Sequence, residues 1–121
     1  MILDYLAYAI LITTVILGGF GLFRPRWTMT LLNLAPEGGN QGYSEIRAVN
    51  GAMFVGLGLA GLLLPAPAAA VLGFAYLAAA GGRLCSIFLD DSGTRMIWRF
   101  VGVEFLFGVL LIASNWSALS S

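Results

Sequence analysis

Apolar residues fill most of the chain in four long runs, which short polar segments separate. The runs cover residues 5–23, 43–64, 67–89 and 96–118. Each is close to the ~20 apolar residues that an α-helix needs to cross the hydrocarbon core of a bilayer. Pro65 and Pro67 cannot continue a helix, so they make a tight turn between the second and third runs. The pattern predicts an all-α integral membrane four-helix bundle that forms one domain, residues 1–121.

The connection between the first two runs, residues 27–42, is the longest one. Its second part contains Pro36, Gly38 and Gly39 and is typical of a flexible loop. Its first part, at about residues 27–35, is too short to span a bilayer and too apolar for open water. It is predicted either to lie at the headgroups as an interfacial segment or to pack against the bundle.

Composition supports a membrane location and excludes several kinds of chemistry. Hydrophobic residues make up 60% of the chain and charged residues only 10%, which is not the composition of a soluble domain. Six acidic and six basic residues cancel, so no net charge attracts nucleic acid. With Cys85 as the one cysteine and no histidine, no disulfide within the chain, metal site or cofactor is expected. The first run lacks the features of a cleaved secretory signal, so we expect it to be retained.

The basic residues, all of them arginine, predict the orientation. Arg24, Arg26, Arg95 and Arg99 lie in or beside the first and third loops, and Arg47 and Arg83 lie in the helix ends that face the same side. By the positive-inside rule, loops one and three are cytoplasmic and both termini are external. The expected location is a bacterial inner membrane.

Six polar residues inside the predicted spans are the candidate site, because charges within membrane helices usually face a partner or a cavity. They all occupy the cytoplasmic half: Glu45, Arg47, Asn50, Arg83, Arg99 and Glu104. Arg83 and Glu104 come at matching depth, roughly 10 Å inside, on helices joined by a short turn, which predicts an ion pair. Glu45 is expected to pair with Arg99. On an α-helix, Arg47 and Asn50 would share a face.

Two interpretations of this polar cluster remain open. In the first, the charges form ion pairs that hold the helices together. Such pairs are needed because an unpartnered charge in lipid costs far more free energy than each pair contributes. In the second, they line a pocket for a polar or anionic ligand, such as a lipid headgroup, a quinone head or a carboxylate substrate. No pair of nucleophile and base is present, so no catalytic residue is assigned.

Small residues on the second span predict close helix packing. Ala52, Gly56 and Ala60 recur every four residues and form a smooth stripe, with Gly51 beside it. Facing stripes are expected from Gly18 and Gly21 on the first span and from Ala78 and Gly82 on the third. Self-association through the stripe is the alternative. At the start of this span, Ser44 is expected to cap the helix, with Glu45 at the positive end of its dipole.

The runs GYSEIRAVNGAMFVGLGLA and GRLCSIFLD, with Glu104 in the fourth span, resemble a bacterial family of unknown function. Its members are small four-helix membrane proteins with a Ser-Glu-Ile-Arg-Ala signature, loosely similar to DoxX and DoxD-like proteins. The resemblance covers most of the chain and implies fold and topology. It rests on Glu45, Ile46, Arg47, Ala48, Gly51, Gly82, Arg83 and Glu104. DoxD-type relatives are associated with quinone-linked oxidation of sulfur compounds, but this chain has no second thiol or metal ligand for that activity.

Three functions fit these observations. The leading hypothesis is a non-enzymatic accessory or assembly subunit of a larger inner-membrane complex, or a small homo-oligomer, with the lipid bilayer and other membrane proteins as partners. The alternative is binding or transport of a polar, anionic or lipid-like ligand in a cytoplasm-facing pocket. A quinone- or lipid-linked enzyme would require Glu45 or Glu104 to transfer protons.

Overall fold

The computed structural model describes residues 2–120, which form four long helical segments in the predicted all-α arrangement. The first is α1 (Ile2–Phe23), and the second is a continuous rod of α3 (Gln41–Glu45), η1 (Ile46–Ala52) and α4 (Met53–Leu63). The third and fourth are α5 (Ala68–Asp90) and α6 (Arg95–Ser114). Each segment is long and apolar enough to cross a membrane. The chain is therefore a multi-pass membrane protein with a four-helix fold, as the sequence predicts.

Two predicted features of the helix ends differ from the structure. α6 ends at Ser114 rather than near residue 118. The Asn115 side chain donates a hydrogen bond from Nδ2 to the Leu111 carbonyl at 2.9 Å, and a separate short helix, α7 (Trp116–Leu119), follows. The second segment begins at Gln41, so Ser44 lies inside it and does not cap it.

The four segments form two tightly packed hairpins. Within the first, a Cβ added to Gly18 of α1 would lie 2.8 Å from the Gly51 carbonyl oxygen and 2.9 Å from the Val55 nitrogen. Within the second, a Cβ added to Gly108 of α6 would lie 2.8 Å from the Gly73 carbonyl oxygen on α5. In both hairpins the backbones meet because glycine leaves no side chain between them.

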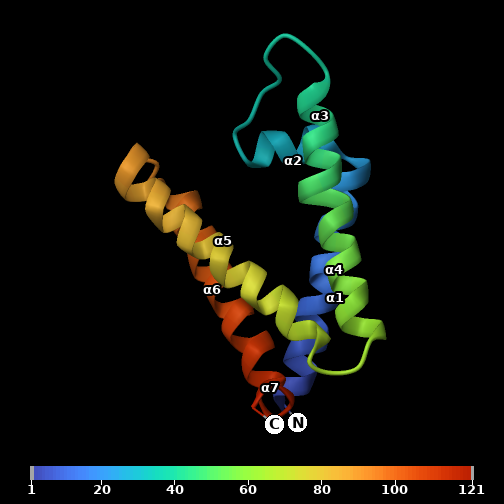
Figure 1. Cartoon of the computed structure of the whole chain (residues 1–121). Coiled ribbons are helices and arrows are strands. Elements are labelled where there is room, and N and C mark those ends of the chain that lie inside the picture. Colours follow the sequence, from blue (N-terminus) through green and yellow to red (C-terminus); the bar gives the residue numbers. More distant parts are fainter. Residues whose placement is uncertain (1, 121) are drawn as a thin grey trace.

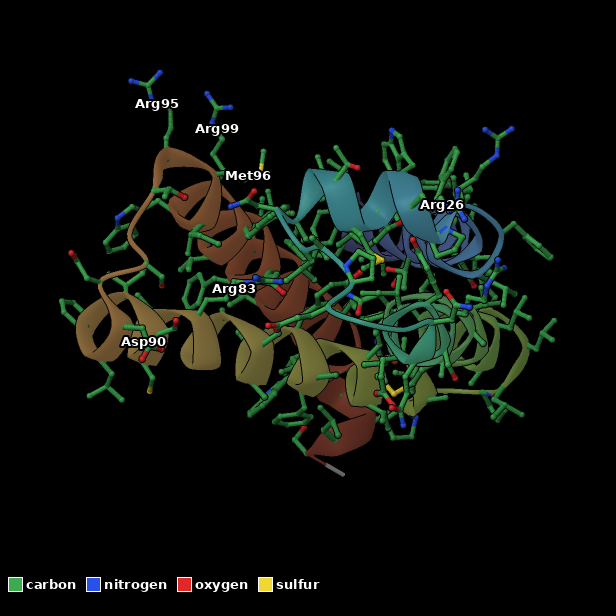
Figure 2. The ribbon with its side chains drawn as sticks, turned by 90° about the horizontal axis from the view of Figure 1, so that it is seen from above. Arg26, Arg83, Asp90, Arg95, Met96 and Arg99 are labelled. Atoms are coloured by element: carbon green, nitrogen blue, oxygen red, sulfur yellow. The ribbon has the colours of Figure 1, made fainter. Side chains whose placement is uncertain are left out.

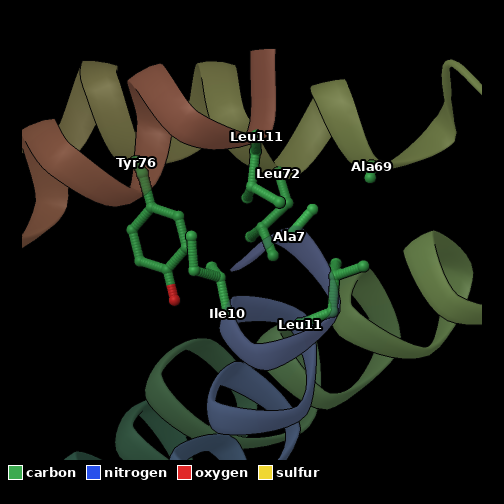
Figure 3. Close-up of a cluster of buried hydrophobic side chains, with 7 residues drawn as sticks. All are labelled: Ala7, Ile10, Leu11, Ala69, Leu72, Tyr76 and Leu111. Carbon is green, nitrogen blue, oxygen red and sulfur yellow. The ribbon is translucent and has the colours of Figure 1, made fainter. Parts of the chain in front are cut away.

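The two hairpins meet at one end of the molecule and diverge toward the other (Figure 1). Both termini and the α4–α5 connection lie at the closed end, and the α5–α6 turn lies at the open end. A cluster of buried side chains from α1, α5 and α6 joins the hairpins (Figure 3): Ala7, Ile10, Leu11, Ala69, Leu72, Tyr76 and Leu111. This core holds the hairpins at a fixed angle and leaves space between them nearer the open end.

The short helix α2 (Pro25–Leu31) runs crosswise to the long helices near the open end (Figure 1). Pro25, Thr28 and Met29 are buried, and the Arg26 guanidinium carbon lies 5.3 Å from the centre of the Tyr43 ring on α3. Of the two predicted arrangements, packing against the bundle is therefore present. The exposed residues of α2 are both polar and apolar, Arg26, Trp27, Thr30 and Leu31, and its position at the headgroups stays a prediction.

The glycines that contact α1 do not follow the predicted stripe on the second segment. Gly51, Gly58 and Gly61 approach α1, whereas an added Cβ at Gly56 or at Gly82 of α5 would find nothing within 4 Å. Ala52 is exposed and Ala60 is half-buried. Positions four apart advance about 40° beyond a full turn, so a stripe of that spacing drifts away from a straight helix contact. The stripe stays a prediction for contacts with other chains.

Candidate functional site

A cavity of about 320 Å³ lies between the two hairpins. Its lining comes from α1, α2, η1, α4, α5 and α6, so no hairpin forms it alone. Most of the lining is aliphatic or aromatic, including Phe54, Phe100 and Phe107. Five of its polar residues come from four different elements, α1, η1, α5 and α6: Thr14, Asn50, Tyr76, Arg99 and Glu104.

Two buried hydroxyl groups lie side by side where the cavity meets the core. Thr14 Oγ1 and Tyr76 Oη are 2.5 Å apart, and Thr14 Oγ1 also donates to the Ile10 carbonyl at 2.8 Å. Because a hydroxyl has one hydrogen, Tyr76 is the donor to Thr14. The Tyr76 ring packs edge-on against Phe107, with the ring centres 5.5 Å apart. The pair therefore satisfies its own donors and links the first hairpin to the second.

An ion pair joins the two helices of the second hairpin. Arg83 Nε of α5 lies 2.5 Å from Glu104 Oε1 of α6, which brings together the pair that the sequence predicts. The side chains are 32% and 13% exposed, respectively, and the Arg83 guanidinium carbon lies 4.9 Å from the centre of the Phe100 ring. Arg83 lies between α5 and α6 (Figure 2). Glu104 lines the cavity, and its charge there is compensated by Arg83.

Arg47 and Asn50 lie on different sides of the second segment. Arg47 Nη1 donates to the Leu22 carbonyl at 2.6 Å, which places a cation at the C-terminal end of α1, where the helix dipole favours it. Asn50 lines the cavity instead. Both residues belong to η1, a π-helical stretch. A π-helix has i→i+5 hydrogen bonds and a wider turn than an α-helix, so residues three apart no longer share a face.

The remaining two candidates are not paired. Glu45 is exposed and lies outside the cavity lining, whereas Arg99 is exposed and belongs to that lining. Within residues 2–120, no ion pair joins Glu45 to Arg99. Of the six predicted polar residues, the cavity therefore gathers Asn50, Arg99 and Glu104, with Arg83 behind Glu104.

Sequence reasoning missed Thr14, Tyr76 and the part of α2 that lines the cavity, including Trp27 and Thr28. Thr14 and Tyr76 had a usable signal. Each places a hydroxyl group near the middle of an apolar span, where it needs a partner inside the protein. The role of α2 had no such signal, because an amphipathic segment looks the same at a membrane surface and against a bundle.

Fold and site together define a four-helix membrane protein with a cavity between its helices. A profile for a domain of unknown function, DUF4345, matches residues 2–114. The chain belongs to this family. No curated protein and no solved structure matches the chain. In the described part of the chain, no group of three or more histidine, cysteine, aspartate or glutamate side chains is placed to hold a metal ion.

Proposed function

We propose that this protein binds an amphipathic, lipid-like ligand in the cavity between its two hairpins. The observation that carries the proposal is the cavity itself, with its largely apolar lining and few polar groups. Its volume of about 320 Å³ falls at the lower end of the range of about 300–1,000 Å³ for small-molecule sites. The alternative that the sequence left open, a ligand pocket, is therefore the function that the geometry supports best.

The polar groups around the cavity are mostly paired with one another, which indicates that the cavity suits a mainly apolar part of a ligand. Tyr76 donates to Thr14, Thr14 donates to a backbone carbonyl, and Glu104 is paired with Arg83. These groups do not require a polar ligand to satisfy them. Within residues 2–120, the side chain of Asn50 makes no hydrogen bond and is free to bind a polar group of a ligand. An apolar chain with one polar group matches this distribution.

Two variants on α6 test the proposal with the same substitution in two surroundings. Val103 lines the cavity and is 47% exposed, whereas Val109 is 40% exposed and lies outside the cavity lining. Val103→Phe is expected to narrow the cavity, and Val109→Phe is expected to leave it unchanged. The measurement is the number of lipid molecules that stay bound after purification in mild detergent, counted by native mass spectrometry.

The parent protein and Val109→Phe are expected to retain the same lipid, and Val103→Phe to retain much less. Equal retention by both variants would contradict the proposal, as would a parent protein that retains no lipid. Thermal unfolding of both variants shows whether either has lost its fold.

We also propose the location and orientation that the arginines predict. Arg24, Arg26, Arg95 and Arg99 lie in or beside the first and third loops, and no arginine lies in the termini or the α4–α5 connection. In a bacterial inner membrane this favours a cytoplasmic open end and external termini. Cysteines introduced one at a time at Ser92 and Ser117, in a Cys85→Ser background because Cys85 is exposed, test this by labelling with an impermeant reagent in intact cells. Only the cysteine at position 117 is expected to react.

Four finer predictions stay proposals. These are the similarity to DoxX and DoxD-like proteins, the Ser-Glu-Ile-Arg-Ala signature, the extent of the domain over residues 1–121, and an accessory role beside a larger complex. The domain boundaries include residues 1 and 121, which lie outside the described residues. Co-purification from native membranes tests the accessory role, because such a subunit would bring a constant set of membrane proteins with it.

A further inference from the structure

We infer that the ligand is an anionic lipid that reaches the cavity sideways from the membrane, with one chain between the hairpins and its headgroup on Arg99. This inference rests on the proposed function and adds three features to it. They are the side on which the cavity opens, the charge of the headgroup and the residue that binds it.

The exposure of the lining residues locates the opening. Leu17 of α1, Trp27 of α2 and Val103 of α6 all line the cavity, and they are 50%, 50% and 47% exposed. On the opposite wall, Phe54 of α4 is half-buried and Tyr76 of α5 is buried. The cavity therefore opens between α1, α2 and α6. Two of these helices, α1 and α6, are long and apolar enough to span the membrane, so an opening between them faces lipid and a chain can enter without crossing water.

Arg99 is placed at this opening to bind a headgroup. It lines the cavity, and its side chain projects away from the helices on the side where α2 and α6 lie (Figure 2). It comes four residues after the start of α6, or about 6 Å along the helix. At that depth, a long arginine side chain reaches the headgroups while its aliphatic part stays in the apolar layer.

Charge complementarity favours an anion at Arg99. Among residues 2–120, Glu104 is the one acidic residue that lines the cavity, and it is paired with Arg83. Arg99 has no ion-pair partner in the same range, so its charge remains available. A guanidinium binds phosphate or carboxylate oxygens with two parallel hydrogen bonds. Phospholipids and fatty acids both combine such an anion with an apolar chain.

The size of the cavity limits what lies inside it. At about 320 Å³, it suits one chain rather than a complete phospholipid. A second chain and most of the headgroup would stay outside, in the membrane and at its surface. This arrangement leaves the paired hydroxyls and the ion pair undisturbed.

The fluorescence of Trp27 shows whether a lipid chain is in the cavity, because Trp27 lines it. In a background with Trp98→Phe and Trp116→Phe, Trp27 is the remaining tryptophan. The protein is placed in phosphatidylcholine vesicles that contain a minor fraction of phosphatidylglycerol with bromine on its chains, which quenches nearby tryptophan. A parallel arm uses brominated phosphatidylcholine, and a third uses a brominated fatty acid. We expect a preference for the anionic lipid of about five-fold, the factor that one arginine near an anionic headgroup contributes.

Arg99→Gln is expected to remove this preference, whereas Arg95→Gln is the matched control. Arg95 lies one turn earlier on the same helix, is also exposed and does not line the cavity. If Arg95→Gln reduces the preference as much as Arg99→Gln does, the effect is a general surface charge and the inference is wrong. It is also wrong if neither brominated phosphatidylglycerol nor the brominated fatty acid quenches Trp27 more than brominated phosphatidylcholine does in the parent. A preference confined to the fatty acid supports the inference and identifies a free acid as the ligand.

The Val103→Phe variant distinguishes a failure of the inference about charge from a failure of the proposed function. If that variant does not reduce quenching by any lipid, no chain occupies the cavity and the proposed function fails. If it reduces quenching by neutral and anionic lipids alike, and the parent shows no anionic preference, the cavity binds lipid and only the inference about charge fails.

Discussion

Replacing Gly18 by alanine tests a close backbone contact between the two helices of the first hairpin. The added methyl group would lie 2.8 Å from the Gly51 carbonyl oxygen and 2.9 Å from the Val55 nitrogen. Non-bonded atoms prefer a separation of at least ~3.5 Å, so the helices would have to separate by about 0.7 Å. Both neighbouring atoms belong to the backbone and cannot turn away. We therefore expect a loss of about 1–3 kcal/mol in the free energy of unfolding, the usual cost of overpacking.

The adjacent residue on the same helix provides the control. A Cβ at Gly19 would find nothing within 4 Å. Gly19→Ala is therefore expected to leave stability unchanged, or to raise it by up to about 1 kcal/mol through helix propensity. The assay is reversible unfolding in mixed detergent micelles, followed by circular dichroism. Equal stability of the two variants would show that α1 and η1 are not in backbone contact at Gly18.

Two further predictions concern the side chains that join the helices. Arg83→Gln or Glu104→Gln alone is expected to destabilise the protein by up to about 3 kcal/mol, below the full cost for a buried pair because Arg83 is partly exposed. The double variant should recover part of that loss in the same unfolding assay; a simple sum of the two losses would argue against a direct pair. For Thr14→Val and Tyr76→Phe, a double-mutant cycle should give a coupling of about 0.6–1.7 kcal/mol, and a coupling of zero would refute the hydrogen bond between the hairpins.

The spans were predictable because their signal is local. A helix that crosses lipid must satisfy its own backbone hydrogen bonds and present apolar side chains, so four apolar runs predict four helices. The end of α6 was not predictable from hydropathy. It depends on Asn115, whose side chain bonds to the Leu111 carbonyl, and the apolar pattern continues beyond that point.

The polar site was only partly predictable, because it depends on helix rotation. Depth along the sequence was enough to match Arg83 with Glu104. It could not show that a π-helical stretch between Ile46 and Ala52 directs Arg47 to the end of α1 and Asn50 into the cavity. π-helical turns depend on backbone packing, such as the contact of Gly51 with α1, which has no simple sequence pattern.

The cavity could not be predicted from the sequence, because it results from the angle between the two hairpins. That angle depends on the core at the closed end, where α1 contacts α5 and α6. The leading prediction of an accessory subunit came from the scarcity of chemical groups outside the membrane. That role stays a prediction. We propose a ligand pocket because a space lined by both apolar and polar side chains becomes visible only once the helices are placed.

The most direct test of a lipid-occupied cavity is a measurement of nuclear Overhauser effects between lipid chains and aromatic rings of the protein. Phe54 and Phe107 line the cavity, whereas Phe74 and Phe88 are 57% and 78% exposed on the outer surface. In lipid nanodiscs, with all other protein protons replaced by deuterium, we expect effects from acyl-chain protons to all four rings. Effects to Phe74 and Phe88 without any to Phe54 and Phe107 would contradict the account, because they would show that lipid surrounds the protein but does not enter it.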